Sequence, residues 1–154
     1  MRRAILLAAL LAAVPAAAEP NPLARFPTPT PAQVNGRWNG VDLERRSNCA
    51  AEQNNGTRGT YAQFDVTADA TTFVIAQSGI TGLNCTYSGR NEIVGNRLRV
   101  TGTLSCSDGK QGNFETTSID VNAFSLALQM SIRLTATESC SIDALLSMAR
   151  LSPQ

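Results

Sequence analysis

The feature that most constrains the fold of this chain is a strict alternation of side-chain polarity between residues 97 and 106. Apolar or small residues occupy every second position (Leu98, Val100, Gly102, Leu104 and Cys106), and polar residues occupy the positions between them. Because successive side chains of a β-strand point to opposite faces, this pattern predicts a strand with one face on a core and the other in water. The Asp108-Gly109 pair that follows suits a tight hairpin turn, so a second strand is expected from Gly112.

Similar patterns recur along the chain and predict eight strands, at residues 36–46, 58–67, 72–77, 83–88, 97–105, 112–120, 124–134 and 140–151. Strands of this length, joined by short turns rich in Gly, Asn and Asp, are typical of antiparallel barrels and sandwiches. Segment 140–151 also fits a helical stripe, but an eighth strand would pair with the first and leave no open edge. We therefore predict an all-β fold, an antiparallel up-and-down barrel of about eight strands.

Residues 1–18 have the features of a secretory signal peptide. Two arginines follow the initial methionine, an apolar run covers residues 4–14, and small residues precede a cleavage site after Ala18. The apolar run is too short for a stable membrane-spanning helix, so we expect no membrane anchor. These features predict a periplasmic or secreted protein.

The expected mature chain divides into an arm and one domain. Five of the seven prolines lie between residues 19 and 31, and proline both lacks an N–H and restricts the residue before it to extended geometry. We therefore predict a Pro-rich flexible arm over residues 19–35 and a β-barrel domain over residues 36–154.

Charge and composition exclude several classes of function. Removal of residues 1–18 lowers the count of Lys and Arg from 13 to 11 against 12 Asp and Glu, which leaves a net charge of −1. This balance argues against a nucleic-acid partner and against electrostatic binding to membranes. The chain contains no His, which excludes His-based catalytic triads, zinc sites that use His and His proton shuttles.

Four cysteines in an exported chain predict two disulfides. Three pairings are open from spacing alone, and strand counting chooses among them. In an eight-stranded up-and-down barrel the first and last strands are neighbours, so the pairs Cys49–Cys140 and Cys85–Cys106 meet at the same rim. Gaps of 36, 21 and 34 residues lack the close pairs of a thiolate zinc site, so we expect no metal, and we expect no cofactor.

Gly36-Arg37-Trp38 opens the first predicted strand and contains the only Trp of the chain. This triplet resembles the Gly-x-Trp signature of the lipocalins and of the wider calycin group of small barrels. The resemblance implies that Trp38 closes one end of the barrel, that a basic residue near the end of the last strand packs over it, and that the other end is a cup for a small, often apolar molecule. Arg150 stands at the matching basic position. The alternative is that Trp38 is a core residue without a ligand.

Asp42 and Glu44 lie two residues apart on the first predicted strand and so share one face. Paired carboxylates are the acid and base of glycoside hydrolysis. Because Arg45 and Arg46 follow directly, we expect instead a solvated, charged strand face. We therefore predict no catalytic residue and a protein that is not an enzyme.

These observations predict an exported binding protein, a monomer whose barrel holds a small apolar or amphipathic ligand. The candidate ligand-binding residues are aromatic: Trp38, Phe64, Phe73, Tyr87 and Phe124. The polar loop 48–59 is expected at the open mouth, where binding loops are commonly found. The alternative partner is an exported protein, with the chain acting as a protein-binding module such as an inhibitor of an exported hydrolase. An apolar cavity favours the first hypothesis, and a filled barrel favours the second.

Overall fold

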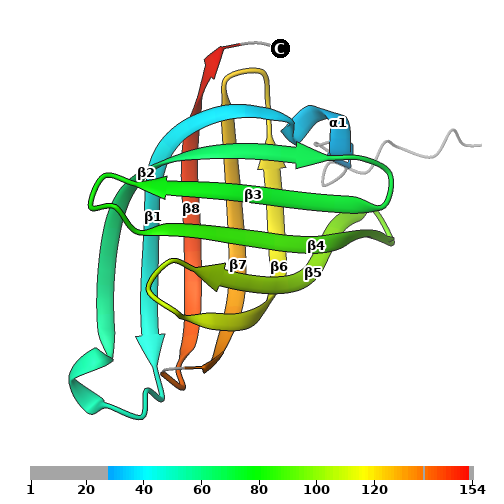
Figure 1. Cartoon of the computed structure of the whole chain (residues 1–154). Helices are drawn as coiled ribbons and strands as arrows, with labels where there is room; N and C mark the ends of the chain where they lie inside the picture. The colour runs from blue at the N-terminus through cyan, green and yellow to red at the C-terminus, as the bar shows by residue number, and fades with distance from the viewer. Residues whose placement is uncertain (1–27, 137, 153–154) are drawn as a thin grey trace, which may run out of the picture.

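The computed structural model describes residues 28–136 and 138–152. Eight antiparallel strands form a closed barrel in sequential order, as Figure 1 shows. The strands are β1 (Gly36–Ser47), β2 (Gly56–Ala68), β3 (Thr72–Gly79), β4 (Asn84–Val94), β5 (Arg97–Cys106), β6 (Gln111–Val121), β7 (Ser125–Ala136) and β8 (Ser141–Ser152), with a short helix α1 (Pro31–Val34) before β1 and a 3₁₀ turn η1 (Glu52–Asn54) before β2. The predicted fold class is confirmed. The predicted signal peptide and residues 19–27 of the predicted arm lie outside the described residues.

The last strand closes the barrel. β8 pairs on one side with β7 and on the other with β1, in a register that runs from Trp38 opposite Arg150 to Ser47 opposite Ser141. The strand interpretation of residues 140–151 is therefore confirmed over the helical one. With both neighbours of β1 in place, the sheet has no free edge at its seam.

Both disulfides lie at one end of the barrel. Cys49–Cys140 joins the β1–β2 connection to the β7–β8 connection, and Cys85–Cys106 links paired positions of β4 and β5. The predicted pairing is confirmed. We call this end the disulfide rim; it holds the connections 48–55, 80–83 and 107–110, and residues 138–140.

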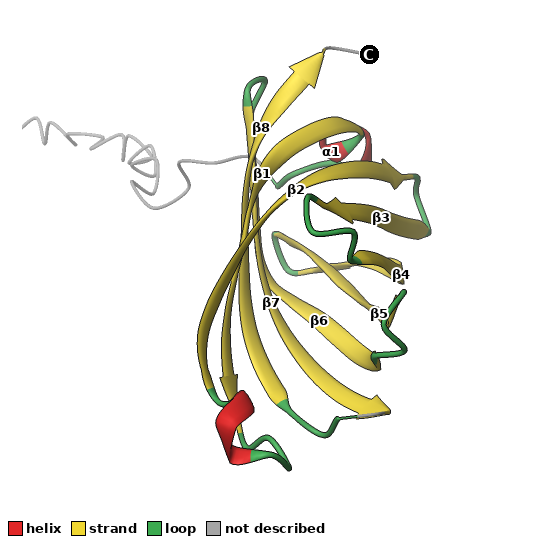
Figure 2. Ribbon diagram, turned by 60° about the vertical axis from the view of Figure 1, so that its left-hand side comes forward, coloured by secondary structure: helices red, strands yellow, loops and turns green. Residues whose placement is uncertain are grey.

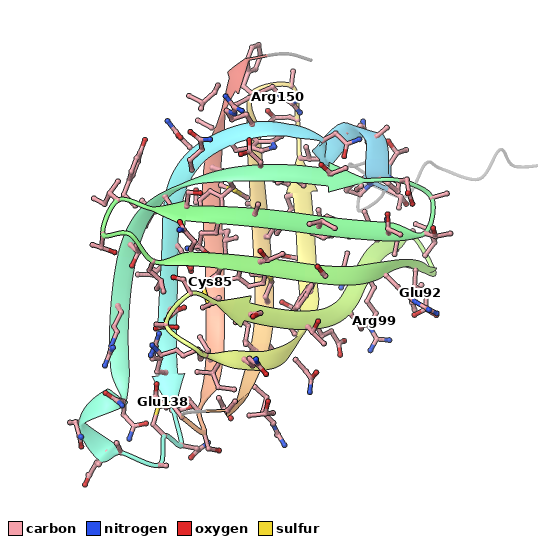
Figure 3. All side chains as sticks on the ribbon, in the orientation of Figure 1. Cys85, Glu92, Arg99, Glu138 and Arg150 are labelled. Carbon is pink, nitrogen blue, oxygen red and sulfur yellow. A yellow bond between two sulfur atoms is a disulfide. The ribbon has the colours of Figure 1, made fainter. Side chains whose placement is uncertain are left out.

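The opposite end is closed by α1, Trp38 and Arg150. Trp38 is fully buried, and its indole Nε1 donates a hydrogen bond of 3.0 Å to the carbonyl of Val34. The Arg150 guanidinium carbon lies 4.0 Å from the centroid of the Trp38 ring. Its Nη1 and Nη2 atoms donate hydrogen bonds of 2.8 and 2.9 Å to the carbonyls of Asn35 and Gln33. Arg150, labelled near the end of β8 in Figure 3, thus makes the contact that the lipocalin resemblance implies.

Residues 31–35 do not belong to the flexible arm that the proline content predicts. They form α1 and its C-cap, and the side chain of Val34 is fully buried in the core. Pro31 opens the helix, where its missing N–H costs no hydrogen bond, and Asn35 bonds both backbone groups of Ala68 through its side chain. The ordered domain therefore begins before Gly36. None of the helices in residues 28–136 and 138–152 has the length and hydropathy that crossing a membrane requires.

Replacement of Arg150 by Met is expected to lower the free energy of unfolding by about 2–3 kcal/mol, because it removes the Trp38 stacking contact and two charge-assisted hydrogen bonds. Urea unfolding at pH 7 measures the loss. Arg133→Met, at an exposed position on β7, is the matched control and is expected to change stability by less than about 0.5 kcal/mol. Equal losses in the two variants would show that Arg150 does not fasten this end of the barrel.

The interior is filled by apolar side chains from all eight strands, which form one core cluster. Phe64, Phe73 and Tyr87 are 0–1% exposed, and the rings of Tyr87 and Phe114 pack edge to face with centroids 5.6 Å apart. Large aromatic residues therefore occupy the middle of the barrel, between the Trp38 end and the disulfide rim.

Candidate functional site

Four of the five predicted ligand-binding residues belong to the packed core. Trp38, Phe64, Phe73 and Tyr87 are at most 1% exposed and contact other core residues. Their side chains face the interior, as predicted. An eight-stranded barrel is only wide enough for packed side chains or one small ligand, and here the aromatic side chains take up the interior.

Phe124 does not line the interior, and that part of the prediction is wrong. It is 82% exposed and lies in the turn between β6 and β7. Asn122 shapes this turn, because its Oδ1 accepts hydrogen bonds of 2.8 and 2.9 Å from the backbone N–H groups of Phe124 and Ser125. β7 starts only at Ser125, so its inward row begins at Leu126.

The barrel wall is interrupted between β5 and β6 at the end that carries α1. The two strands pair only from Thr101 opposite Glu115 to the disulfide rim, although β5 begins at Arg97 and β6 continues to Val121. The backbone N–H of Val100 donates a hydrogen bond of 2.8 Å to the side-chain hydroxyl of Thr116, which takes the place of a backbone carbonyl of β6. The register of β6 on β7 also shifts here, which is typical of a β-bulge. Figure 1 shows β5 running across the view, whereas β6 starts beside it and then bends upward, away from β5.

This interruption leaves a hollow of about 560 Å³, which we call the wall groove. It is lined by Thr28, Pro29, Gln33, Asn96, Arg97, Leu98, Thr117, Ser118, Ile119, Asp120, Val121, Asn122, Ser125 and Ala127. Leu98 and Ile119 are buried members of the core, whereas Arg97 and Asp120 are exposed. The groove therefore has an apolar floor, a charged margin and the volume of an ordinary small-molecule site.

The residues before α1 form one side of the wall groove. The Thr28 hydroxyl donates a hydrogen bond of 2.7 Å to the carbonyl of Asn96 in the β4–β5 turn. Pro29 and Gln33 continue the lining towards α1. The groove is thus bounded by three separate parts of the chain, which is why no single stretch of sequence indicated it.

A second candidate site lies inside the barrel near the disulfide rim. Asp42, Glu44 and Arg46 alternate along the inner face of β1, and we call them the polar row. Asp42 is 4% exposed and Arg46 9%, so the expected solvated strand face is wrong. The cause is the closure of the sheet into a barrel, because one face of β1 then points into the interior and only the other meets solvent. The polar row shares its alternation with Trp38 and therefore faces inwards.

Figure 2 shows the wall of β1, β2, β7 and β8 extending beyond β3 and β4 at the disulfide rim. The registers agree, because β2 and β3 pair only as far as Ala62 opposite Gly79, whereas β1 and β2 continue to Arg46 opposite Gly56. The predicted loop 48–59 belongs to this extension, with residues 48–55 as the connection and the rest in β2. The rim end of the polar row therefore lies on the longer side of the barrel.

Asp42 ends a chain of buried hydrogen bonds. The Tyr87 hydroxyl donates a hydrogen bond of 3.1 Å to Gln77 Oε1, and Gln77 Nε2 donates one of 3.1 Å to Asp42 Oδ2. Burial, together with the negative charge of Glu44, raises the pKa of Asp42 to about 7. Burial also raises the pKa of Tyr87 well above its usual value, so Tyr87 remains a donor. Because Asp42 Oδ2 accepts from Gln77, a proton bound by Asp42 resides on Oδ1.

The rim end of the polar row is an ion-pair cluster. Arg46 Nη2 lies 2.6 Å from Glu44 Oε2, and Arg46 Nη1 lies 3.5 Å from Glu138 Oε2. Glu138, labelled in Figure 3, stands at the disulfide rim beside Cys49 and Cys140. The ligand atoms of these last three residues lie within 4.8 Å of one another, but both sulfur atoms are bonded in the disulfide and are not thiolate ligands. This trio is therefore not a metal centre.

No model of a known protein family matches the chain, and no curated protein matches it in sequence. The fold and the two sites thus define a small, closed, eight-stranded antiparallel β-barrel with two disulfides, an aromatic interior and a groove in its wall. This architecture is compatible with a small lipocalin-like barrel.

Proposed function

We propose that this chain is an exported, non-enzymatic binding protein that holds a small amphipathic ligand in the wall groove. The observation that carries the proposal is the groove itself, a hollow of about 560 Å³ with a buried apolar floor at Leu98 and Ile119 and charged groups at Arg97 and Asp120. An apolar body on the floor and a polar head at the margin would satisfy both parts of this lining. The features of residues 1–18 and the two disulfides support export to the periplasm or beyond.

The packing of the barrel favours the wall groove over a central cup as the ligand site. Phe64 and Phe73 are fully buried among core residues, so a ligand in the middle of the barrel would have to displace them. We also propose that the chain is a lipocalin-like barrel, on the support of the Arg150 contact with Trp38 and the closed eight-stranded topology.

Binding of 1-anilinonaphthalene-8-sulfonate, a small amphipathic anion, tests the groove. We expect saturable binding of one probe per protein, seen as a rise in probe fluorescence. Ala127→Glu places a longer, negatively charged side chain in the groove lining, which repels the sulfonate of the probe, and is expected to weaken binding by about tenfold or more. Ala76→Glu, at an exposed position on the outer face of β3, is the matched control. Unchanged affinity in Ala127→Glu, or equal loss in both variants, would remove the groove as the site.

The alternative, a protein-binding module such as an inhibitor of an exported hydrolase, is favoured by one feature of the outer surface. Val41, Leu43 and Tyr61 are 43–48% exposed on the outer faces of β1 and β2, and Ile80 in the β3–β4 connection is 77% exposed. Val41 lies opposite Tyr61 in the β1–β2 pairing, and the backbone N–H of Ile80 donates a hydrogen bond of 3.3 Å to the Tyr61 carbonyl. These exposed side chains therefore belong to one region of the surface. Native mass spectrometry of the unreduced protein separates the two functions, because a carrier retains a small mass and a protein-binding module forms a complex.

A further inference from the structure

Three buried side-chain atoms near the disulfide rim have no hydrogen-bond partner among the described residues. They are Asp42 Oδ1 and Arg46 Nη1 of the polar row, and Glu138 Oε1. Asp42 is 4% exposed, and its other oxygen, Oδ2, accepts a hydrogen bond from Gln77. A buried polar atom without a partner is destabilising because it has lost its hydrogen bonds to water, so the position of Asp42 Oδ1 calls for a compensating interaction.

We infer that Asp42 is the anchor of a second binding site, which takes a primary ammonium group through Asp42 Oδ1. This site is separate from the wall groove and does not depend on the function proposed for it. Glu44 lies one inward position nearer the rim and is partly exposed. Arg46, the next inward position, is 9% exposed and paired with Glu44 and Glu138, so a ligand that enters from the disulfide rim has to displace the Arg46 side chain.

The charges around Asp42 select a cation. Asp42, Glu44 and Glu138 supply three carboxylates against the single guanidinium of Arg46 in this set. A hard divalent cation such as Ca²⁺ or Mg²⁺ would need about six or more oxygen ligands, which is more than these three carboxylates are placed to supply. An ammonium group instead needs only a few acceptors, and its three N–H donors are the complement of an orphaned carboxylate oxygen.

The groups that face Asp42 also make its ligand compete with a proton. They are Glu44 and Arg46 on β1, Gln77 on β3 and Tyr87 on β4. The positions paired with Asp42 are Thr60 on β2 and Leu146 on β8, neither of which titrates. Because burial and Glu44 raise the pKa of Asp42 to about 7, its Oδ1 carries a proton at pH 6 and is free to accept at pH 8. Ammonium affinity is therefore expected to fall about tenfold from pH 8 to pH 6.

The test is an NMR titration of the oxidised protein with ethylammonium chloride at constant ionic strength. The readouts are the Asp42 carboxyl ¹³C resonance and the Gln77 side-chain amide. We expect both to shift and saturate at pH 8, with the weaker binding at pH 6 described above. Tetramethylammonium, which has the charge but no N–H donor, and ethanol, which has no charge, are expected to leave both resonances in place.

Asp42→Asn is expected to weaken ethylammonium binding about ten- to a hundredfold, read at the Gln77 amide. Asp65→Asn, which alters a carboxylate on the outer face of β2, is the matched control and should bind as the unaltered chain does. Equal shifts with tetramethylammonium would mean that these resonances respond to positive charge alone, and the assignment of a primary ammonium group would be wrong. The absence of any saturating shift, or an affinity that does not change with pH, would mean that Asp42 Oδ1 is served by water alone, and the inference would be wrong. The pH comparison uses the unaltered chain, so it decides the question even if Asp42→Asn fails to fold.

Discussion

Replacing Cys49 and Cys140 together by alanine is expected to lower the free energy of unfolding by about 4.5 kcal/mol, and replacing Cys85 and Cys106 by about 3 kcal/mol. The difference follows from the lengths of chain that the disulfides close in the unfolded state, which are 91 and 21 residues. The disulfide Cys49–Cys140 also joins the two connections beside the seam between β1 and β8. Its removal therefore weakens the barrel where the first and last strands meet.

Urea unfolding of the two double variants, without reductant, measures both losses. Each variant replaces one well-buried cysteine, Cys140 or Cys85, by a similar small residue, so the packing losses nearly cancel in the comparison. The slope of the unfolding free energy against urea should increase most in Cys49→Ala/Cys140→Ala, because its unfolded chain expands most. A larger loss for the Cys85–Cys106 pair would contradict the entropic account and would place the main stabilisation inside β4 and β5.

The barrel could be predicted from the sequence because its constraints are local. Alternation in β5 and β7 defines inward rows, and a strand at 140–151 is the element that leaves no free edge. Once the strands alternate in direction, Cys49 and Cys140 must stand at the same end, as must Cys85 and Cys106. The disulfide pairing is therefore a consequence of strand number and does not require the coordinates.

For the polar row, residue type and alternation predict opposite faces, and the structure follows the alternation. Trp38 defines the inward face of β1, and Asp42, Glu44 and Arg46 follow at even spacing from it. Charged residues are rarely buried unless they are paired, which made a solvated face the simpler interpretation. The compensating groups, Gln77 and Glu138, come from β3 and from the β7–β8 connection, so the sequence does not show that they meet Asp42 and Arg46. Gln77 itself follows Phe73 and Ile75 at even spacing, which is a usable signal for an inward polar residue.

Only a weak pattern in the sequence indicates the wall groove. Inward residues of β6 occupy even positions up to Thr116 and odd positions from Ile119, and such a change of alternation inside a strand is typical of a β-bulge. The separation of β5 from β6 at this point depends on the whole barrel and on Thr28 to Gln33, so the volume of the groove had no counterpart in the sequence.

The unfolding free energy is expected to fall by up to about 4 kcal/mol as pH rises from 4 to 8, owing to Asp42 alone. Its pKa in the folded protein is about 7, against a usual value of 3.8, because burial and then the charge of Glu44 disfavour the carboxylate. Between these two values the folded state binds more protons than the unfolded state, so stability decreases with pH. The loss begins near pH 4 and is complete slightly above pH 7. Asp69 acts in the opposite direction, because backbone hydrogen bonds from Thr71 and Thr72 lower its pKa to about 2, which places its effect at more acid pH.

Asp42→Asn isolates this contribution, because asparagine is close in shape to the protonated acid and does not ionise. Urea unfolding of both proteins at half-unit pH steps, in buffers free of amines, gives two curves of unfolding free energy against pH. The change in their separation with pH is the contribution of Asp42 ionisation. At pH 4 we expect the variant to be as stable as the unaltered protein or slightly less stable. Its stability relative to the unaltered protein should then increase as the pH rises through 7. Amine-free buffers matter because a bound ammonium would stabilise the ionised carboxylate and reduce the separation. Curves that stay parallel from pH 4 to pH 8 would show that Asp42 ionises in the folded barrel as readily as in water, which its burial and its unpartnered Oδ1 do not allow without a bound cation.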